Sequence, residues 1–385
     1  MVGMVENTTI VIVGAGVAGL TLGNFLLRHG IGCVVLERHS REYVERRQRA
    51  GTVDARGVRM YRAWGLGEVL AGDPLPEVAG GFWIDGEELP IDLDDEDNAD
   101  SILCPQQVLV RNLTDVFLRD GGDLRFEAAD VSLGDVVRYR DTGGAVRAIR
   151  GDFVAGCDGD RGVSRASIPD GVLTRYAHEY GYAWLSVLAA VPGTSSGMAI
   201  HSRGLAGLIP RGAHASRIYL QIPLTDTVEQ WPDERIWREL DARYGSPRQS
   251  GPITDKRIVP LRSVVYDPMS YGNLYLLGDA AHIVPPMSAK GINLALNDAE
   301  TFARAVILQA EKGDPSLLDS YSADCLRHVW NYQAFAAWIT DLMHDAGDTT
   351  YAGEFRQQIA RAELQRQFTS PAANRLFSEL TSGVN

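Results

Sequence analysis

The stretch that decides the fold is Thr9–Gly19, TIVIVGAGVAG. Its first five residues are apolar or β-branched without interruption, which predicts a buried strand. Three glycines in the spacing GxGxxG follow at once, and a helix is expected directly after them. Ala18, Leu22, Phe25 and Leu26 share one face of this helix. The order of strand, glycine turn and helix predicts the start of a βαβ unit, and therefore an α/β fold.

The second half of this unit predicts a dinucleotide site. Cys33–Leu36 form the next strand, and Glu37 follows it, where a carboxylate can accept hydrogen bonds from ribose hydroxyls. Gly14 would make the tight turn, Gly16 would let a pyrophosphate approach the backbone, and Gly19 would let helix and strand pack closely. The alternative is a tight turn followed by a surface glutamate. Because the chain holds a single such fingerprint, we expect one resident dinucleotide, FAD, and a nicotinamide cofactor that binds only transiently.

Composition narrows the class of protein. A chain of 385 residues with 45% hydrophobic and 23% charged residues is typical of a globular protein of two or three domains. The formal charge of −13 argues against nucleic acid or an anionic membrane as a partner. We also expect no signal peptide and no membrane span, and hence a cytoplasmic protein. The cysteines are scattered without a metal-ligand spacing and are expected to be reduced: Cys33, Cys104, Cys157 and Cys325.

Two later motifs repeat the pattern of a strand that ends in a carboxylate. CDGDRGVSR (Cys157–Arg165) places Asp158 after an apolar strand, although Asp-Gly can also be a simple turn. In GDAAH, the strand Leu274–Leu277 leads directly into Gly278 and Asp279. Such a carboxylate can reach a ribityl hydroxyl, whereas the histidine of this motif, His282, is expected to be structural.

In this order and spacing, GAGVAG, CDGDRGVSR and GDAAHIVPP resemble the single-component FAD-dependent aromatic hydroxylases, in particular the 4-hydroxybenzoate 3-hydroxylases among them. ERHSREYVERRQRAG and QIPLTDTVEQWPDERIW match in the same order, so the resemblance covers nearly the whole chain. It implies an α/β, Rossmann-like FAD-binding domain with an inserted α+β substrate domain on a mixed sheet, and C-terminal helices. The expected boundaries are 1–175 for the FAD domain, with 71–100 contributing to the substrate domain, 176–265 for the substrate domain, 266–315 for the second FAD part and 316–385 for the helices.

The resemblance also implies cofactor contacts. The positions that match FAD contacts are Gly14, Gly16, Gly19, Glu37, Arg47, Arg49, Gln106, Asp158, Gly278, Asp279, Pro286, Gly291, Ile292 and Asn293. The region that matches the NADPH contacts contains Arg38 to Tyr43, Arg161, Arg165 and Arg262. Arginine forks suit the phosphates of NADPH, although each of these arginines could instead belong to a solvated face.

The implied reaction is the hydroxylation of an aromatic ring. A hydride from NAD(P)H reduces the flavin, O2 adds at its C4a atom, and the resulting hydroperoxide transfers an oxygen atom to the ring. The backbone of Pro285–Lys290 and the helix from Gly291 would stabilise negative charge on the flavin. The residues expected at the reacting atoms are Pro286, Met287 and Glu77.

The substrate residues match the family only in part. Arg211 matches the arginine that pairs with a substrate carboxylate, and Tyr219 matches a neighbouring tyrosine. A serine of the family is replaced by Ile209, and a threonine near the substrate by Met287. The residues that relay the phenolic proton align with Met198, Thr381 and Glu77, so the relay is absent as such. Ala289 completes the set of predicted substrate contacts.

These departures leave the substrate open. We expect a hydroxy- or amino-benzoate whose ring is already activated, or a different relay with Glu77 as its base. The alternatives are 4-hydroxybenzoate itself and a non-catalytic flavin-binding ligand sensor. Flavin-dependent halogenases share this fold, but their WxWxIP segment is missing. The family further implies a homodimer. We expect core or subunit contacts, rather than substrate ligands, at three aromatic residues of the helical tail: Trp330, Phe335 and Trp338.

Overall fold

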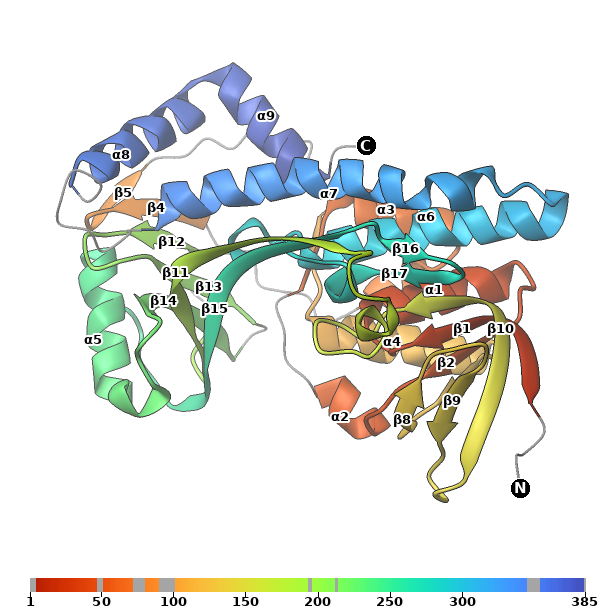
Figure 1. Ribbon diagram of the computed structural model, residues 1–385. Helices are drawn as coiled ribbons and strands as arrows, with labels where there is room; N and C mark the ends of the chain where they lie inside the picture. Colours follow the sequence, from red (N-terminus) through yellow and green to blue (C-terminus); the bar gives the residue numbers. More distant parts are fainter. Residues whose placement is uncertain are drawn as a thin grey trace.

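The computed structural model describes residues 5–46, 51–71, 80–89, 101–192, 196–211, 214–344 and 354–383. Two large sheets lie side by side within these residues, and two long helices run along them (Figure 1). The first sheet carries the N-terminal βαβ unit. The second sheet is built mainly from the middle of the chain.

The first sheet has the strand order β16-β17-β10-β1-β2-β7, with the hairpin strands β8 and β9 attached to β10. Its strands are β1 (Glu6–Val13), β2 (Cys33–Leu36), β7 (Asp123–Arg125), β8 (Ala129–Ser132), β9 (Val137–Arg140), β10 (Val146–Gly156), β16 (Ser270–Tyr271) and β17 (Leu274–Leu276). β1 is parallel to β2 and β10, and Val13 pairs with both Leu36 and Gly156. The carboxyl ends of three strands therefore meet at one edge, where the predicted cofactor residues follow.

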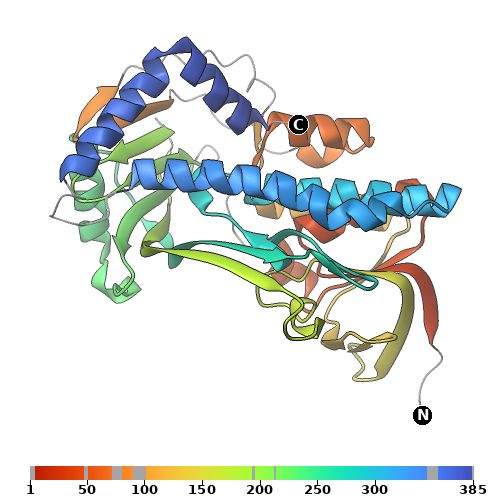
Figure 2. The ribbon, with the colours of Figure 1, turned by 45° about the horizontal axis from the view of Figure 1, so that its top comes forward.

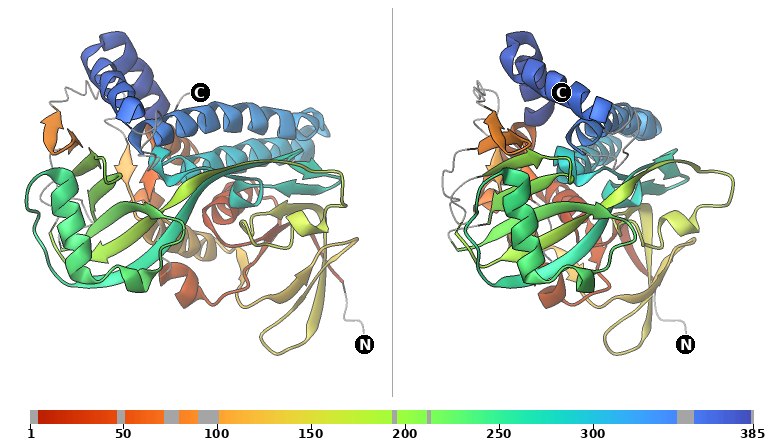
Figure 3. Two further views of the ribbon diagram at one scale, coloured as in Figure 1. Left: turned by 60° about the vertical axis from the view of Figure 1, so that its left-hand side comes forward. Right: turned by 90° about the vertical axis from the view of Figure 1, so that its left-hand side faces the viewer.

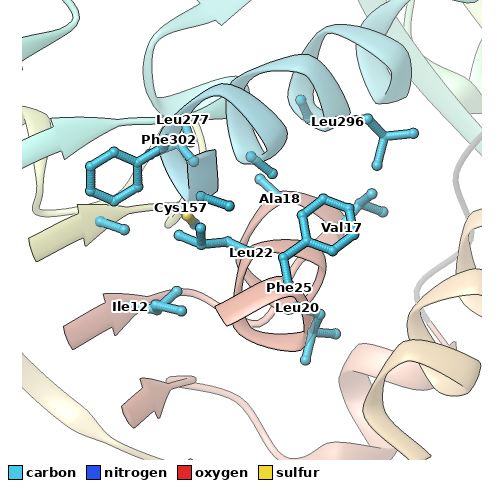
Figure 4. Close-up of a cluster of buried hydrophobic side chains, with 14 of the residues drawn as sticks. Ile12, Val17, Ala18, Leu20, Leu22, Phe25, Cys157, Leu277, Leu296 and Phe302 are labelled. Atoms are coloured by element: carbon cyan, nitrogen blue, oxygen red, sulfur yellow. The ribbon is translucent and has the colours of Figure 1, made fainter. Parts of the chain in front are cut away.

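Helices surround this sheet, and all but the shortest of them bury apolar side chains in its core. They are α1 (Val17–Arg28), α2 (Arg41–Arg46), α3 (Ala55–Ala63), α4 (Gln106–Arg119), α6 (Gly291–Lys312) and α7 (Ser316–Met343). In the core, Leu22 and Phe25 of α1 lie between Ile12 of β1 and Leu296 of α6 (Figure 4). The helix predicted after the glycine turn is confirmed, and all four of its predicted apolar residues are buried.

The second sheet has the strand order β18-β15-β11-β14-β13-β12-β4-β5. Its strands are β4 (Gly80–Ile84), β5 (Glu87–Leu89), β11 (Thr174–Ala189), β12 (Ser196–Ile200), β13 (Ala206–Pro210), β14 (Ser216–Pro223), β15 (Ile253–Asp267) and β18 (His282–Ile283). Every pairing is antiparallel except that of β12 with β4, so the sheet is mixed, as predicted. The helix α5 (Asp233–Tyr244) covers one face through Ile236 and Leu240.

The opposite face of the second sheet is covered by the C-terminal helices. α7 runs along α6 and continues over this sheet (Figure 2), and the hairpin of α8 (Glu354–Thr369) and α9 (Pro371–Ser382) lies beside β4 and β5 (Figure 3). Ile339 of α7 and Leu364 of α8 share an apolar cluster with Trp184 of β11. The predicted helical tail is confirmed.

A short two-stranded sheet completes the fold. β3 (Thr52–Val53) pairs with β6 (Ile102–Leu103) beside α3.

Trp330 is not a core residue of the single chain, because it is 42% exposed and meets the ring of Tyr176 edge-on at 5.4 Å. In the part of the chain that the structure describes, no helix is long and apolar enough to cross a membrane. The domain boundaries stay a prediction.

Candidate active site

The three glycines of the turn after β1 have two different roles. Gly14 has a φ of +108°, and a Cβ atom there would lie 2.4 Å from the carbonyl oxygen of Cys157. A Cβ atom on Gly19 would lie 2.0 Å from the carbonyl oxygen of Gly14. A Cβ atom on Gly16 would meet nothing within 4 Å. Packing therefore requires Gly14 and Gly19, whereas Gly16 faces the space that a pyrophosphate needs.

The start of α1 is suited to an anion. Gly16 is its N-cap, and no side chain caps the helix. The first backbone N–H groups of a helix lack partners within it and carry partial positive charge. The residues present thus fit a dinucleotide phosphate at this turn.

Glu37 is held next to the turn by two backbone groups. Its Oε2 atom accepts a hydrogen bond from Ala15 N at 2.9 Å, and its Oε1 atom accepts one from His39 N at 2.9 Å. The residue is 8% exposed. A carboxylate offers about four acceptor sites, so each oxygen can still accept a ribose hydroxyl.

Asp158 closes its own turn at the end of β10. Its Oδ2 atom accepts hydrogen bonds from Ser164 N at 2.8 Å and Ser164 Oγ at 2.9 Å. Its Oδ1 atom is buried and has no partner among the described residues. Burial raises the pKa of this carboxyl above its usual range. An acceptor without a partner thus lies at the same strand edge as Glu37.

The predicted NADPH arginines fall into two groups. Arg262 Nη2 lies 2.5 Å from Asp160 Oδ2, and Arg165 donates to the carbonyl oxygens of Asp160 and Ala280. Both are thus tied to the neighbouring backbone or carboxylates. Arg38 and Arg161 are exposed.

The second half of the predicted cofactor site begins at the end of β17. Gly278 has a φ of +61°, and its N–H donates to Asp298 Oδ2 at 2.9 Å, while Asp279 is half-buried. The short helix Pro286–Ser288 follows, and α6 then begins without a side-chain cap. Because Leu276 pairs with Gly156, this turn and Asp158 lie at the same edge of the sheet.

The remaining predicted cofactor residues surround the start of α6. Both side-chain donors of Asn293 are used inside the protein, because they donate to the carbonyl oxygens of Thr52 and Ala289, and its Oδ1 atom accepts from Asp54 N at 3.1 Å. Its backbone and the second lone pair of Oδ1 are thus what it can offer to a ligand. The residues Pro286, Gly291, Ile292 and Gln106 are half-buried.

The predicted substrate residues are brought together on one face of the second sheet. Met198 pairs with Gly207, which in turn pairs with Tyr219. Met198, Tyr219, Ile209 and Met287 all belong to one apolar cluster, so the short helix between β18 and α6 reaches this face of the second sheet. Ala289 is exposed and has a φ of +54°.

The Nη1 atom of Arg211 is buried and has no hydrogen-bond partner among the described residues. Arg211 lies two positions after Ile209, whose partner across the strands is Arg217. Arg217 is 6% exposed, and its Nη1 atom is 3.4 Å from Ser186 Oγ. Burial lowers the pKa of Arg217, and the like charge of Arg211 adds to this effect. The structure therefore places two guanidinium groups near each other, one of them with a buried donor that lacks an acceptor.

An aromatic wall beside Tyr219 was missed by the sequence analysis. Trp184 lies 4.6 Å from Tyr219 between ring centroids, and its Nε1–H donates to His344 Nε2 at 2.6 Å. His344 Nδ1 donates to the carbonyl oxygen of Thr340 at 2.7 Å, and the imidazole stacks on Tyr182. Strand alternation in the stretch GYAWLSVLA could have placed Trp184 on this face. The sequence around His344 does not indicate a site residue, because this histidine simply follows the end of a long helix.

Some predictions cannot be placed. Arg47, Arg49 and Glu77 lie outside the described residues. Thr381 is described, and its carbonyl oxygen accepts from Lys290 Nζ at 2.8 Å. Within the described ranges, no group of three or more His, Cys, Asp or Glu residues could hold a metal ion.

Comparison with known proteins adds to this geometry. Residues 7–336 match the FAD binding domain family. The chain is 35% identical over 390 residues to the p-hydroxybenzoate hydroxylase of Acinetobacter baylyi, an alignment that covers 98% of this chain and 96% of that protein. A probable NADH-specific resorcinol 4-hydroxylase of Rhodococcus jostii is 27% identical over 385 residues, which cover 93% of this chain and 69% of that protein.

Solved structures agree in fold. The p-nitrophenol 4-monooxygenase of Pseudomonas putida superposes with a TM-score of 0.83 at 18% identity and covers 99% of this chain and 100% of that one. An aklavinone-11 hydroxylase, solved in a ternary complex with FAD and aklavinone, gives a TM-score of 0.74 at 19% identity over 88% of this chain and 69% of that one. The predicted fold class is confirmed.

Proposed function

Since this chain belongs to the family of FAD-dependent aromatic hydroxylases, we propose that its substrate is a benzoate that carries an amino or hydroxyl group on the ring, with NADPH as the electron donor. The observation that carries the benzoate assignment is the buried Nη1 atom of Arg211. A buried donor without an acceptor costs about 1–3 kcal/mol, and more when it is charged. A substrate carboxylate would remove this cost and would fix the ring in one orientation.

The neighbourhood of Arg211 supports an anionic ligand. Arg217 lies near it on the same face of the sheet, 3.7 Å from its carboxylate partner Asp255, and a second negative partner would be favoured beside the two guanidinium groups. Tyr219 lies next to Arg217 in an apolar cluster, with its ring against Trp184. A ligand with a carboxylate at one end and an aromatic ring behind it matches this order of charged and apolar side chains.

The chain's own contribution to the reaction is binding, orientation and exclusion of water. When bound, FAD supplies the activation of dioxygen and the transfer of one oxygen atom to the ring. Glu37, Gly16 and Asp279 would hold the cofactor, and the uncapped start of α6 offers partial positive charge to an anionic group. Met198, Met287 and Trp184 would keep water from the ring.

The apolar side chains at the substrate positions bear on how the ring is activated. Met198 and Ile209 stand where the resemblance implies hydroxyl groups, and neither can accept a phenolic proton. We therefore propose that the substrate brings its own electron-donating group. The names of two relatives, p-hydroxybenzoate hydroxylase and resorcinol 4-hydroxylase, support a ring with hydroxyl groups. Glu77 remains the candidate for a replacement base.

The NADPH assignment rests on exposed arginines. Arg38 follows β2 closely, and Arg161 follows Asp158, so both come after strand ends at the same edge of the first sheet. An exposed guanidinium can form two-pronged bonds with the 2′-phosphate of NADPH. Arg262 is bonded to Asp160 and would have to exchange this partner for the cofactor.

The experiment is a panel of substituted benzoates offered to the FAD-loaded protein. It should contain 4-hydroxybenzoate, amino-, dihydroxy- and amino-hydroxybenzoates, and the same rings without the carboxylate. We expect benzoates with two donor groups to stimulate NADPH oxidation and to give a matched amount of hydroxylated product. Stimulation by rings without the carboxylate would contradict the role of Arg211, and a lack of turnover with every ring would favour a ligand sensor.

A further inference from the structure

A buried pair of polar side chains lies next to the turn of Gly278 and takes no part in the contacts proposed above. Asp298 on α6 is 0% exposed, and His282 on β18 is 2% exposed. His282 Nε2 donates to Asp298 Oδ2 at 2.7 Å. A carboxylate buried this deeply is costly unless it is hydrogen-bonded, so Asp298 depends on the partners that surround it.

The same carboxylate oxygen also holds the turn that carries Asp279. Asp298 Oδ2 accepts the N–H of Gly278 at 2.9 Å, and Gly278 has a φ of +61°. A Cβ atom on Gly278 would lie 3.3 Å from the Cβ of Ala295, also on α6, so the turn is packed closely on the helix. One oxygen atom therefore joins the Gly278–Asp279 turn, β18 and α6.

The position of Asp298 on α6 relates the Gly278–Asp279 turn to the start of this helix. Asp298 lies about two turns after Gly291, the first residue of α6. The uncapped N-terminus of α6 and the Gly278–Asp279 turn are the two elements that face the cofactor from this half of the chain. Because Asp298 is part of α6 and accepts a hydrogen bond from the turn, it helps to fix the distance between the turn and the helix.

His282 completes this junction through its hydrogen bond to Asp298. Burial of the imidazole opposes protonation, but the charge of Asp298, its hydrogen bond and the charge of Asp279 together raise the pKa of His282. The two carboxylates therefore favour a proton on this imidazole. Among the other titratable groups that the charge of Asp298 influences, burial raises the pKa values of Cys157, Tyr321 and Cys325, whereas burial lowers the pKa of His328 to about 4.

We propose that His282 and Asp298 are positioning residues for FAD: the pair holds the Gly278–Asp279 turn against α6, so that the ribityl and flavin contacts are preformed. This inference rests on the placement of Asp279 at the ribityl chain. Preformed sites gain affinity because less ordering remains to be done on binding. The adenosine half of the cofactor, at Gly16 and Glu37, should not depend on the pair.

The test measures the binding of two ligands to the full-length protein after removal of FAD. FAD reaches both halves of the site, whereas ADP reaches only the half at Gly16 and Glu37. In Asp298→Asn we expect the dissociation constant of FAD to rise about tenfold or more, and that of ADP to stay within about twofold. His282→Gln keeps a hydrogen-bond donor for Asp298 and should weaken FAD binding less than Asp298→Asn does. This second variant also tests the proposal if Asp298→Asn does not fold.

A matched control is available in the second sheet. Glu239 on α5 is 7% exposed and is paired with Arg203 and Arg243, far from the cofactor residues in the fold. Glu239→Gln should lower the melting temperature without changing the affinity for FAD. If Asp298→Asn behaves in the same way, or weakens FAD and ADP equally, the pair is only a packing element and the proposal is overturned.

The underlying placement of Asp279 is tested separately. Asp279→Asn should weaken FAD binding and leave ADP binding unchanged. Unchanged FAD affinity in this variant would overturn the placement on which the proposal rests. Neither result bears on the benzoate substrate, which the substrate panel decides independently.

Discussion

Lys290 and Asp54 form a buried ion pair although 236 positions separate them in the chain: Lys290 Nζ lies 2.8 Å from Asp54 Oδ2. Their side chains are 2% and 5% exposed. Lys290 Nζ also donates to the carbonyl oxygen of Thr381, so the pair connects the start of α6 to α3 and to the C-terminal helix α9. Burial lowers the pKa of Lys290, while the charge of Asp54 opposes this shift.

We predict that Lys290→Met lowers the free energy of unfolding by about 3–5 kcal/mol, because it leaves the buried carboxylate of Asp54 without its cation. Urea unfolding followed by circular dichroism measures this change. Lys312→Met, at the exposed end of α6, is the control and should lie within about 0.5 kcal/mol of the parent chain. A loss below about 1 kcal/mol for Lys290→Met would show that the pair contributes little. The double variant Asp54→Asn/Lys290→Met should recover part of the loss.

Gly16 and Gly19 should respond differently to the same substitution. Gly16→Ala adds a methyl group where nothing lies within 4 Å, so the protein should keep its stability and lose FAD affinity by about tenfold or more. Gly19→Ala adds a methyl group 2.0 Å from the carbonyl oxygen of Gly14 and should therefore reduce the yield of folded protein. Thermal unfolding of the FAD-free protein and titration with FAD separate the two effects. Equal stability losses in both variants would contradict the assignment of Gly16 to ligand approach.

Arg211→Ala should raise the KM for the substrate by about a hundredfold, because the bond to the substrate carboxylate is lost, while FAD remains bound. Arg211→Lys keeps the charge but not the two-pronged geometry and should recover only part of the affinity. Steady-state kinetics with the best benzoate of the panel, together with the flavin absorbance spectrum, measures both properties. An unchanged KM in Arg211→Ala would contradict the proposal that Arg211 binds the carboxylate of the substrate.

The stability of the protein should fall in mild acid because of His328. Burial, followed by the charge of Arg56, lowers the pKa of His328 from 6.5 to about 4. The unfolded chain therefore binds a proton first, so this contribution to stability is complete above pH 6.5 and is lost as the pH falls toward 4. Because the ring is only partly buried, we expect a loss of about 1–2 kcal/mol over this window.

His328→Phe provides the comparison for this pH dependence. Phenylalanine cannot take up a proton and keeps a ring against Tyr332, whose centroid lies 4.9 Å from that of His328. Urea unfolding at about pH 7 and pH 5 should show a smaller difference for this variant than for the parent chain. Equal differences in the two proteins would assign the acid sensitivity to other groups.

The first sheet and its cofactor edge were predictable because their signals are local. A continuous apolar strand, a glycine spacing and a carboxylate at the next strand end follow one another within Thr9–Glu37, and parallel pairing then brings them to one edge. The substrate face was predictable only in part. Arg211 and Tyr219 matched a family, but Trp184 and His344 are brought together across 160 positions by tertiary packing.

The sequence by itself thus determined the α/β class, the family and the FAD turn, since each depends on residue type and short spacing. Only the tertiary structure decided that Arg211 has a buried donor without an acceptor among the described residues, that the side chain of Asn293 is bonded inside the protein, and that Asp298 is bonded to both Gly278 and His282. Burial and long-range hydrogen bonds depend on which distant segments cover a side chain. That information lies in the packing of the two sheets and the C-terminal helices, and no local pattern contains it.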